Sequence, residues 1–161
     1  MRARIVAKPT PEIVRVVSYL AAFLVLVALV AQLLYSVVLV PLLPADFELD
    51  LSSKSPTSHI MVTPGGVAIG GWTIVILGGL AAAVSLIRSR SGSMLAYACG
   101  AIASVVLPGF AAGLLANAFA ALNGADGSSG APVFFALGCA VGALAVLGAP
   151  RLARQLGQRA P

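Results

Sequence analysis

Charged residues are scarce in this 161-residue sequence, at 9% of the total, whereas 60% of the residues are hydrophobic. A soluble domain of this size needs more polar surface than that, so the composition excludes a soluble fold. No Asp, Glu, Lys, Arg or His lies in the interior of any long apolar run. Because proton relays, ion coupling and intramembrane catalysis depend on such residues, their absence argues against an enzyme or a coupled transporter.

The residues that usually bind cofactors are also few. The single histidine, His59, lies in a polar loop, so there is no pair of intramembrane histidines for haem and no cluster with metal-ligand spacing. Cys99 and Cys139 form no Cys-x-x-Cys motif, and their different depths in two apolar runs disfavour a disulfide. We therefore predict no cofactor, no metal and no catalytic residue, and we interpret both cysteines as small apolar side chains.

What the sequence does contain is four long apolar runs, at residues 18–43, 67–87, 94–122 and 132–149. Each run has about the 20 residues that a helix needs to cross a hydrocarbon core. We therefore predict an all-α integral membrane fold, a four-helix transmembrane bundle forming a single membrane domain over residues 1–161. The loops at 44–66 and 123–131 join the helices on one side. The first run is too long for a cleaved signal peptide and no A-x-A-like site follows it, so we expect this helix to remain.

The charges between the runs sort by sign. Nine of the ten Lys and Arg residues lie on one side of the predicted bundle: Arg2, Arg4, Lys8, Arg15, Arg88, Arg90, Arg151, Arg154 and Arg159. The positive-inside rule then places both termini in the cytoplasm. Attraction to anionic lipids accounts for these cations better than nucleic-acid binding does. Abundant Ala, Gly and Arg favour a GC-rich bacterial genome, and hence a multi-pass protein of the bacterial inner membrane.

Small residues mark where the helices are expected to pack, because helices in lipid associate through close contact and interhelical hydrogen bonds. The candidate packing residues are Gly66, Gly70, Gly78, Gly109, Gly113, Gly138 and Gly142, together with the polar Gln32 and Asn117. Several of these glycines form Gly-x-x-x-Gly pairs. Such pairs serve either internal packing, which we favour, or a homodimer face.

Two polar residues and one proline stand out within the runs. An unsatisfied amide in hydrocarbon is costly, so Gln32 and Asn117 are each expected to hydrogen-bond to another helix, and their similar depths suggest that they pair with each other. Pro108, followed by Gly109, predicts a kink in the third helix. A kink is either static or a hinge for transport, and membrane helices tolerate proline often enough to favour a static one.

The loop at 44–66 is the largest polar segment outside the terminal segments. Apolar and acidic residues alternate over Phe47, Glu48, Leu49, Asp50 and Leu51, and the β-prone segment 59–63 follows, so we predict a small extracytoplasmic β-hairpin. The apolar face of this segment either folds back on the bundle or docks a partner, and its carboxylates form a solvated row that does not converge on a metal ion.

We therefore expect a non-catalytic accessory or assembly subunit of a larger respiratory or cell-envelope complex. Its partners would be other integral membrane proteins, in a hetero-complex or a homodimer, and anionic lipids. The alternative is a small uncoupled carrier or pore for a neutral or apolar solute, in which Pro108, Gly109, Gln32 and Asn117 would be the working residues.

Overall fold

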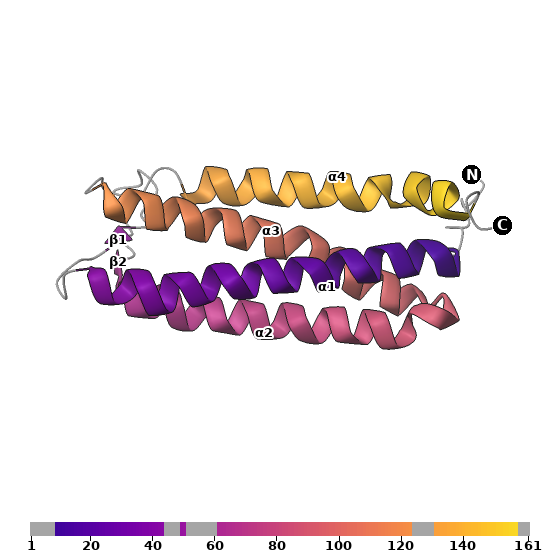
Figure 1. Cartoon of the computed structure of the whole chain (residues 1–161), viewed down its shortest axis with the longest axis horizontal. Helices are drawn as coiled ribbons and strands as arrows, with labels where there is room; N and C mark the ends of the chain where they lie inside the picture. The colour runs from indigo at the N-terminus through magenta and orange to yellow at the C-terminus, as the bar shows by residue number, and fades with distance from the viewer. Residues whose placement is uncertain (1–8, 44–48, 51–60, 124–130, 158–161) are drawn as a thin grey trace, which may run out of the picture.

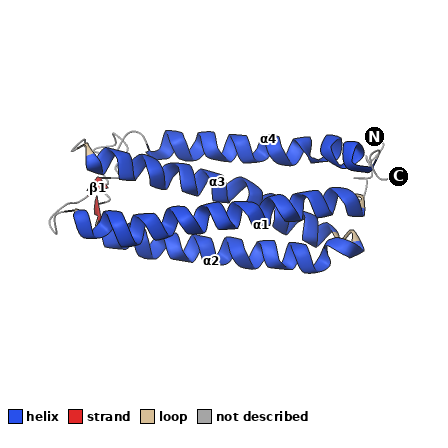
Figure 2. Cartoon of the chain, in the orientation of Figure 1, coloured by secondary structure: helices blue, strands red, loops and turns tan. Residues whose placement is uncertain are grey.

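The computed structural model describes residues 9–43, 49–50, 61–123 and 131–157. Within them, four helices long and apolar enough to cross a membrane run side by side (Figure 1). They are α1 (Pro11–Leu33), α2 (Pro64–Arg88), α3 (Met94–Leu122) and α4 (Ala131–Gly157). A π-helical segment, η1 (Leu34–Leu39), and a short 3-10 segment, η2 (Val40–Leu42), extend α1, and a 3-10 turn, η3 (Ser89–Ser91), follows α2. The expected all-helical bundle is therefore confirmed in outline (Figure 2).

The two ends of the bundle differ. The start of α1 and the end of α4 lie together at one end, which we call the termini end, beside the turn from α2 to α3 (Figure 1). At the other end, the strand end, β1 (Leu49–Asp50) pairs antiparallel with β2 (Met61–Val62), with Leu49 opposite Val62. Two residues a side are too few to establish the expected hairpin, which stays a prediction. Phe47, Glu48 and Leu51 of that segment lie outside the described residues.

The first helix begins before its apolar run, and the last helix ends after its run. Pro11 occupies the first turn of α1, where its missing N–H costs nothing, so the helix begins there and not at Ser18. At the other end of the chain, α4 continues through Pro150 to Gly157, past the expected limit at Ala149. Hydropathy predicts which residues suit lipid, but a helical backbone continues until a cap or a turn ends it. The predicted limits of α3, 94 and 122, agree with the structure.

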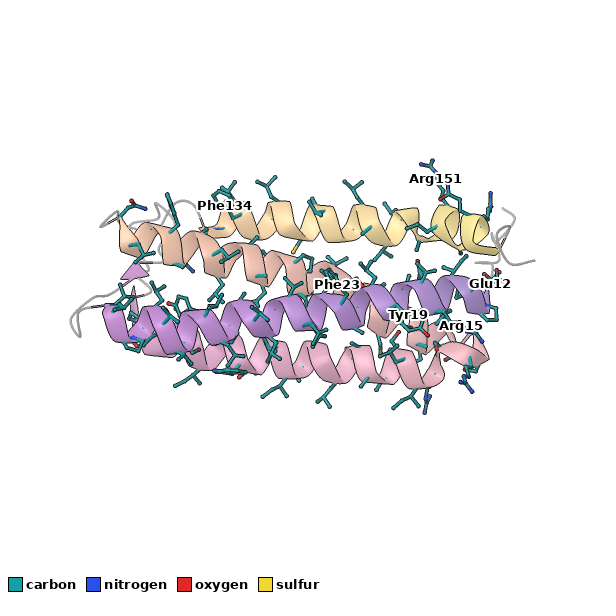
Figure 3. The ribbon with its side chains drawn as sticks, in the orientation of Figure 1. Glu12, Arg15, Tyr19, Phe23, Phe134 and Arg151 are labelled. Carbon is teal, nitrogen blue, oxygen red and sulfur yellow. The ribbon has the colours of Figure 1, made fainter. Side chains whose placement is uncertain are left out.

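Helix α3 is the centre of the bundle. Half of its most apolar 18-residue stretch is buried, against 22%, 22% and 17% for the corresponding stretches of α1, α2 and α4. It packs against all three other helices, whereas α1 touches α4 mainly through Val17, Val146 and Ala149. Large apolar side chains such as Phe23 and Phe134 point outward from the ribbon (Figure 3). An outer surface of this kind suits contact with lipid chains or with other apolar helices.

All the arginines that the structure describes lie toward the termini end: Arg15, Arg88, Arg90, Arg151 and Arg154. Figure 3 shows two of them, Arg15 and Arg151, near that end together with Glu12. The fold therefore collects at one end the cations that lie far apart in the sequence.

Candidate functional site: polar contacts and lateral grooves

Two serines join three helices near the termini end. Ser18 on α1 and Ser85 on α2 are fully buried, and their hydroxyl oxygens lie 2.6 Å apart. The Ser18 hydroxyl also lies 2.7 Å from the Val14 carbonyl, and the Ser85 hydroxyl lies 2.7 Å from the Ala96 carbonyl on α3. These are three close contacts for two hydroxyl protons, so only two of them are hydrogen bonds at any moment. Gly100 on α3 permits this approach, since a Cβ there would lie 2.6 Å from the Ser85 oxygen and 3.0 Å from Val17.

Gln32 joins α1 to α2 in the half of the bundle nearer the strand end. Its side chain is fully buried, and its Nε2 donates to the Ala68 carbonyl at 2.7 Å and to the Ser36 hydroxyl at 3.1 Å. Gly71 makes room for the amide, because a Cβ there would lie 2.7 Å from Gln32 Cδ. The expected interhelical bond is present, but the expected Gln32 to Asn117 pair is not among the hydrogen bonds of the described residues. The acceptor is a backbone carbonyl, and every residue has one, so no sequence pattern could have singled it out.

Helices α3 and α4 pack through glycine at close range. A Cβ at Gly138 would lie 2.7 Å from Gly109 Cα, and one at Gly142 would lie 2.9 Å from the Pro108 ring. Added at Gly109, it would meet Cys139 Sγ and the Phe135 carbonyl. A Cβ at Gly113 would lie 3.5 Å from Phe135 Cβ, which is an ordinary contact distance. Between α2 and α3, a Cβ at Gly78 would lie 2.6 Å from Leu107 Cδ2. Helix α3 runs uninterrupted through Pro108.

Gly66 and Gly70 behave differently from the other predicted packing residues. Both are exposed on α2, and a Cβ added to Gly70 would have nothing within 4 Å. Gly70 therefore has no close contact with another helix among the described residues, and the internal packing that the sequence favours is not seen there. The homodimer face, which is the other use that we considered for this pair, stays a prediction.

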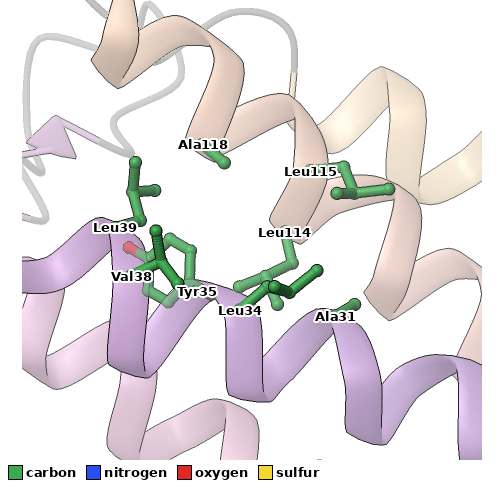
Figure 4. Close-up of a pocket in the computed structure, with 8 residues that line it drawn as sticks. All are labelled: Ala31, Leu34, Tyr35, Val38, Leu39, Leu114, Leu115 and Ala118. Atoms are coloured by element: carbon green, nitrogen blue, oxygen red, sulfur yellow. The ribbon is translucent and has the colours of Figure 1, made fainter.

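One lateral groove lies between α1 and α3 at the strand end. Its walls are Ala31, Leu34, Tyr35, Val38 and Leu39 of α1 and η1, and Leu114, Leu115 and Ala118 of α3 (Figure 4). Tyr35 is only 3% exposed, and its hydroxyl has no hydrogen-bond partner in the part of the chain that the structure describes. The sequence predicts the inward position of Tyr35, because the smaller and polar residues of the first run recur at steps of three, four and seven and so share one face: Ser18, Ala21, Ala22, Ala28, Gln32, Tyr35 and Ser36. What the sequence does not show is that the hydroxyl lacks a partner among the described residues.

A second groove lies over α3 between α2 and α4. Its volume is about 250 Å³, and its walls are Val67 and Ile74 of α2, Phe110, Gly113, Leu114 and Asn117 of α3, and Ala131, Pro132 and Phe135 of α4. Asn117 is only 9% exposed, and its Oδ1 accepts no hydrogen bond from any described residue. Asn117 is therefore an acceptor without a donor beside an apolar groove. Burying such an atom without a donor is costly.

Comparison of the chain with protein-family models, with curated proteins and with solved structures finds no match. Function is therefore inferred from the contacts within the chain.

Proposed function

We propose that this chain is a multi-pass protein of the bacterial inner membrane, with both termini in the cytoplasm, and that it serves as a non-catalytic accessory or assembly subunit of a larger membrane complex. The observation that carries the proposal is the set of polar contacts made by Ser18, Ser85 and Gln32, which link α1, α2 and α3. These polar side chains hold helices together, as expected of a scaffold. The outer apolar surface and the segment 47–51 then supply contacts for partner proteins and lipids.

The orientation is proposed from the positive-inside rule, because the described arginines gather at the termini end. Reporter fusions after Pro161 and within 88–93 should report the cytoplasm, and fusions within 51–58 should report the opposite side. A C-terminus on the outside would overturn the orientation.

The subunit role is tested by replacing Phe47, Leu49 and Leu51 together with Ser. After purification in mild detergent from the native membrane, this variant should lose its co-purifying partner proteins while remaining inserted, because insertion depends on the hydrophobicity of the helices. The matched change replaces three exposed apolar residues with Ala: Leu26 and Val30 of α1 and Val37 of η1. If partners leave only with the α1 variant, recognition happens within the membrane. If no partner co-purifies with the unaltered chain, the subunit proposal fails.

The alternative, an uncoupled carrier, needs α3 to bend at Pro108 and Gly109 during transport. The close packing of Gly138 and Gly142 against these two residues favours a static helix. Pro108→Ala alone separates the two functions, because Gly109→Ala would also place a Cβ against Cys139. A carrier predicts loss of solute uptake into vesicles by a fully folded Pro108→Ala protein, whereas a scaffold predicts unchanged complex assembly.

A further inference from the structure

A third groove lies between α2 and α3, about midway along α2. Its volume is about 190 Å³, and every residue that lines it is apolar: Ile74, Leu77, Gly78 and Ala81 of α2, and Ile102, Ala103, Val106 and Leu107 of α3. The groove opens sideways, since Leu77 and Ile102 on its walls are 60% and 62% exposed. A bundle embedded in a membrane therefore presents this groove to the acyl chains of the bilayer.

One face of α2 connects this groove with a cation. Arg88, the last residue of α2, follows Ala81 by seven residues and Ile74 by fourteen. Seven residues turn a helix by about 700°, only about 20° short of two full turns, so these three residues lie on one face. Arg88 is exposed, and neither α2 nor α3 contains an acidic residue. The groove therefore leads along α2 to a positive charge at the termini end.

The depths of the groove and of the cation match one leaflet of a bilayer. At about 1.5 Å per residue, Ala81 lies about 10 Å and Leu77 about 16 Å from Arg88 along the helix axis. Half of a hydrocarbon core is about 15 Å thick. A lipid whose phosphate group is level with Arg88 thus has its acyl chain at the depth of the groove. Helix α3 supplies the other wall at that depth, because Gly78 packs against Leu107.

We propose that an anionic phospholipid of the leaflet at the termini end binds here, with its phosphate group against Arg88 and one acyl chain in the α2–α3 groove. A helix is about 10 Å across with its side chains, too wide for a groove of this volume, whereas an acyl chain is a single row of methylene groups. The inference rests on the membrane embedding stated under the proposed function, and it gives the expected attraction to anionic lipids a defined site.

Charge, and not the apolar groove, decides which phospholipid binds. An acyl chain that enters the groove leaves other acyl chains, so it gains van der Waals contact but no burial from water. That contact is the same for every headgroup. Arginine near the membrane surface attracts anionic lipids, so a preference between two lipids with identical chains reports on Arg88.

The first test compares dioleoyl-phosphatidylglycerol, which is anionic, with dioleoyl-phosphatidylcholine, by native mass spectrometry of the full-length protein in mild detergent. The wild type should bind phosphatidylglycerol roughly 5-fold more tightly, as expected for one arginine near the headgroup, and Arg88→Gln should abolish most of this preference. Arg151→Gln is the matched control, because Arg151 is an exposed cation at the same end but on α4 (Figure 3). No preference in the wild type, or equal losses in both variants, would overturn the proposal.

The second test fills the groove. Ala81→Phe should weaken phosphatidylglycerol binding roughly 5-fold or more, because the ring takes the space of the acyl chain and removes its contacts. Ala83→Phe, two residues further along α2, is the matched control, since Ala83 is exposed and does not line the groove. Unfolding by SDS checks that both variants are folded. Unchanged binding by a folded Ala81→Phe protein would refute the proposed position of the chain.

The third test locates the lipid and does not depend on the folding of Ala81→Phe. In a chain with Trp72→Phe, a tryptophan is introduced by Ile102→Trp at the groove or by Ile76→Trp, an exposed residue of α2 outside it. The vesicles contain equal parts of phosphatidylcholine and phosphatidylglycerol, and one lipid at a time carries bromine on its acyl chains, which quenches tryptophan fluorescence. Phosphatidylglycerol should be enriched roughly 3-fold beside residue 102, and Arg88→Gln should remove this enrichment.

Beside residue 76, the two lipids should quench about equally. Equal quenching at both positions in the wild-type background would overturn the proposal. None of these results affects the reporter-fusion or co-purification experiments, which measure the orientation and the subunit role.

Discussion

The buried polar oxygens differ in their hydrogen bonding between the two halves of the bundle. Toward the termini end, the buried hydroxyls of Ser18 and Ser85 contact each other, and the Ser85 hydroxyl also contacts the Ala96 carbonyl. Three helices pack closely around Gly100 at this point. Toward the strand end, Gln32 Oε1, Tyr35 Oη and Asn117 Oδ1 lack partners among the described residues, and grooves open on two sides of α3.

The two halves of the bundle therefore differ in how completely their buried polar atoms are paired. The termini half contains the hydroxyl contacts between helices and one buried oxygen without a partner among the described residues, Ser104 Oγ, whereas the strand half contains three such oxygens and the exposed Gly66 and Gly70. The π-helical segment η1 also lies in the strand half, just before Pro41, which cannot donate a backbone hydrogen bond. Matched substitutions in the two halves are therefore expected to change the free energy of unfolding by different amounts.

The largest difference is expected between two glycines. Gly100→Leu should lower the free energy of unfolding by about 3 kcal/mol, because the new side chain must displace Ser85 and Val17 in a closed core. Gly70→Leu should change it by less than about 0.5 kcal/mol in the monomer, because the site is open. Unfolding of the detergent-solubilised protein by SDS, followed by the fluorescence of the single tryptophan, Trp72, provides the measurement. Equal losses would remove the distinction between the halves.

A smaller effect separates two buried serines. Ser85→Ala removes the contacts to Ser18 and Ala96 and should cost about 1 kcal/mol. Ser104 is equally buried, but its hydroxyl has no partner within the described residues, so Ser104→Ala should be neutral within about 0.5 kcal/mol. The same unfolding experiment compares them. A larger loss for Ser104→Ala would mean that its hydroxyl has a role in the bundle that the contacts described here do not show.

The smallest effect compares two amides of the strand half. Gln32→Met removes the bond to the Ala68 carbonyl and should cost about 0.6 kcal/mol. Asn117→Leu removes an acceptor without a donor and should leave the monomer unchanged or about 0.5 kcal/mol more stable. A lower free energy of unfolding for Gln32→Met together with a higher one for Asn117→Leu would support this difference between the two amides. A clear loss for Asn117→Leu in the monomer would show that Asn117 already has a partner within its own chain.

The number of helices and the sorting of charge were predictable from the sequence, whereas the ends of the helices were less so. The four apolar runs predicted the number of long helices in the described residues, and the sorting of Arg and Lys predicted that the start of α1 and the end of α4 lie at the same end. The glycines at 109, 138 and 142, which the sequence suggests as packing residues, lie where α3 and α4 approach too closely to admit a Cβ. The ends of α1 and α4 were less predictable, since hydropathy changes before the helical backbone ends.

For α2, α3 and α4, the tertiary structure decided which of the faces that carry small residues looks inward. In a water-soluble bundle the polar face marks the outside, but here the inner and outer faces are both apolar, so the helical period of hydrophobicity carries little information. The sequence therefore could not separate the open Gly70 from the packed Gly71 beside it, or choose the Ala68 carbonyl as the acceptor for Gln32. The order of apolar and charged residues along the chain determined four long apolar helices and their sorted charges, because span length and flanking charge are local properties. The contacts between helices decided which small and polar residues are packed and which stay exposed.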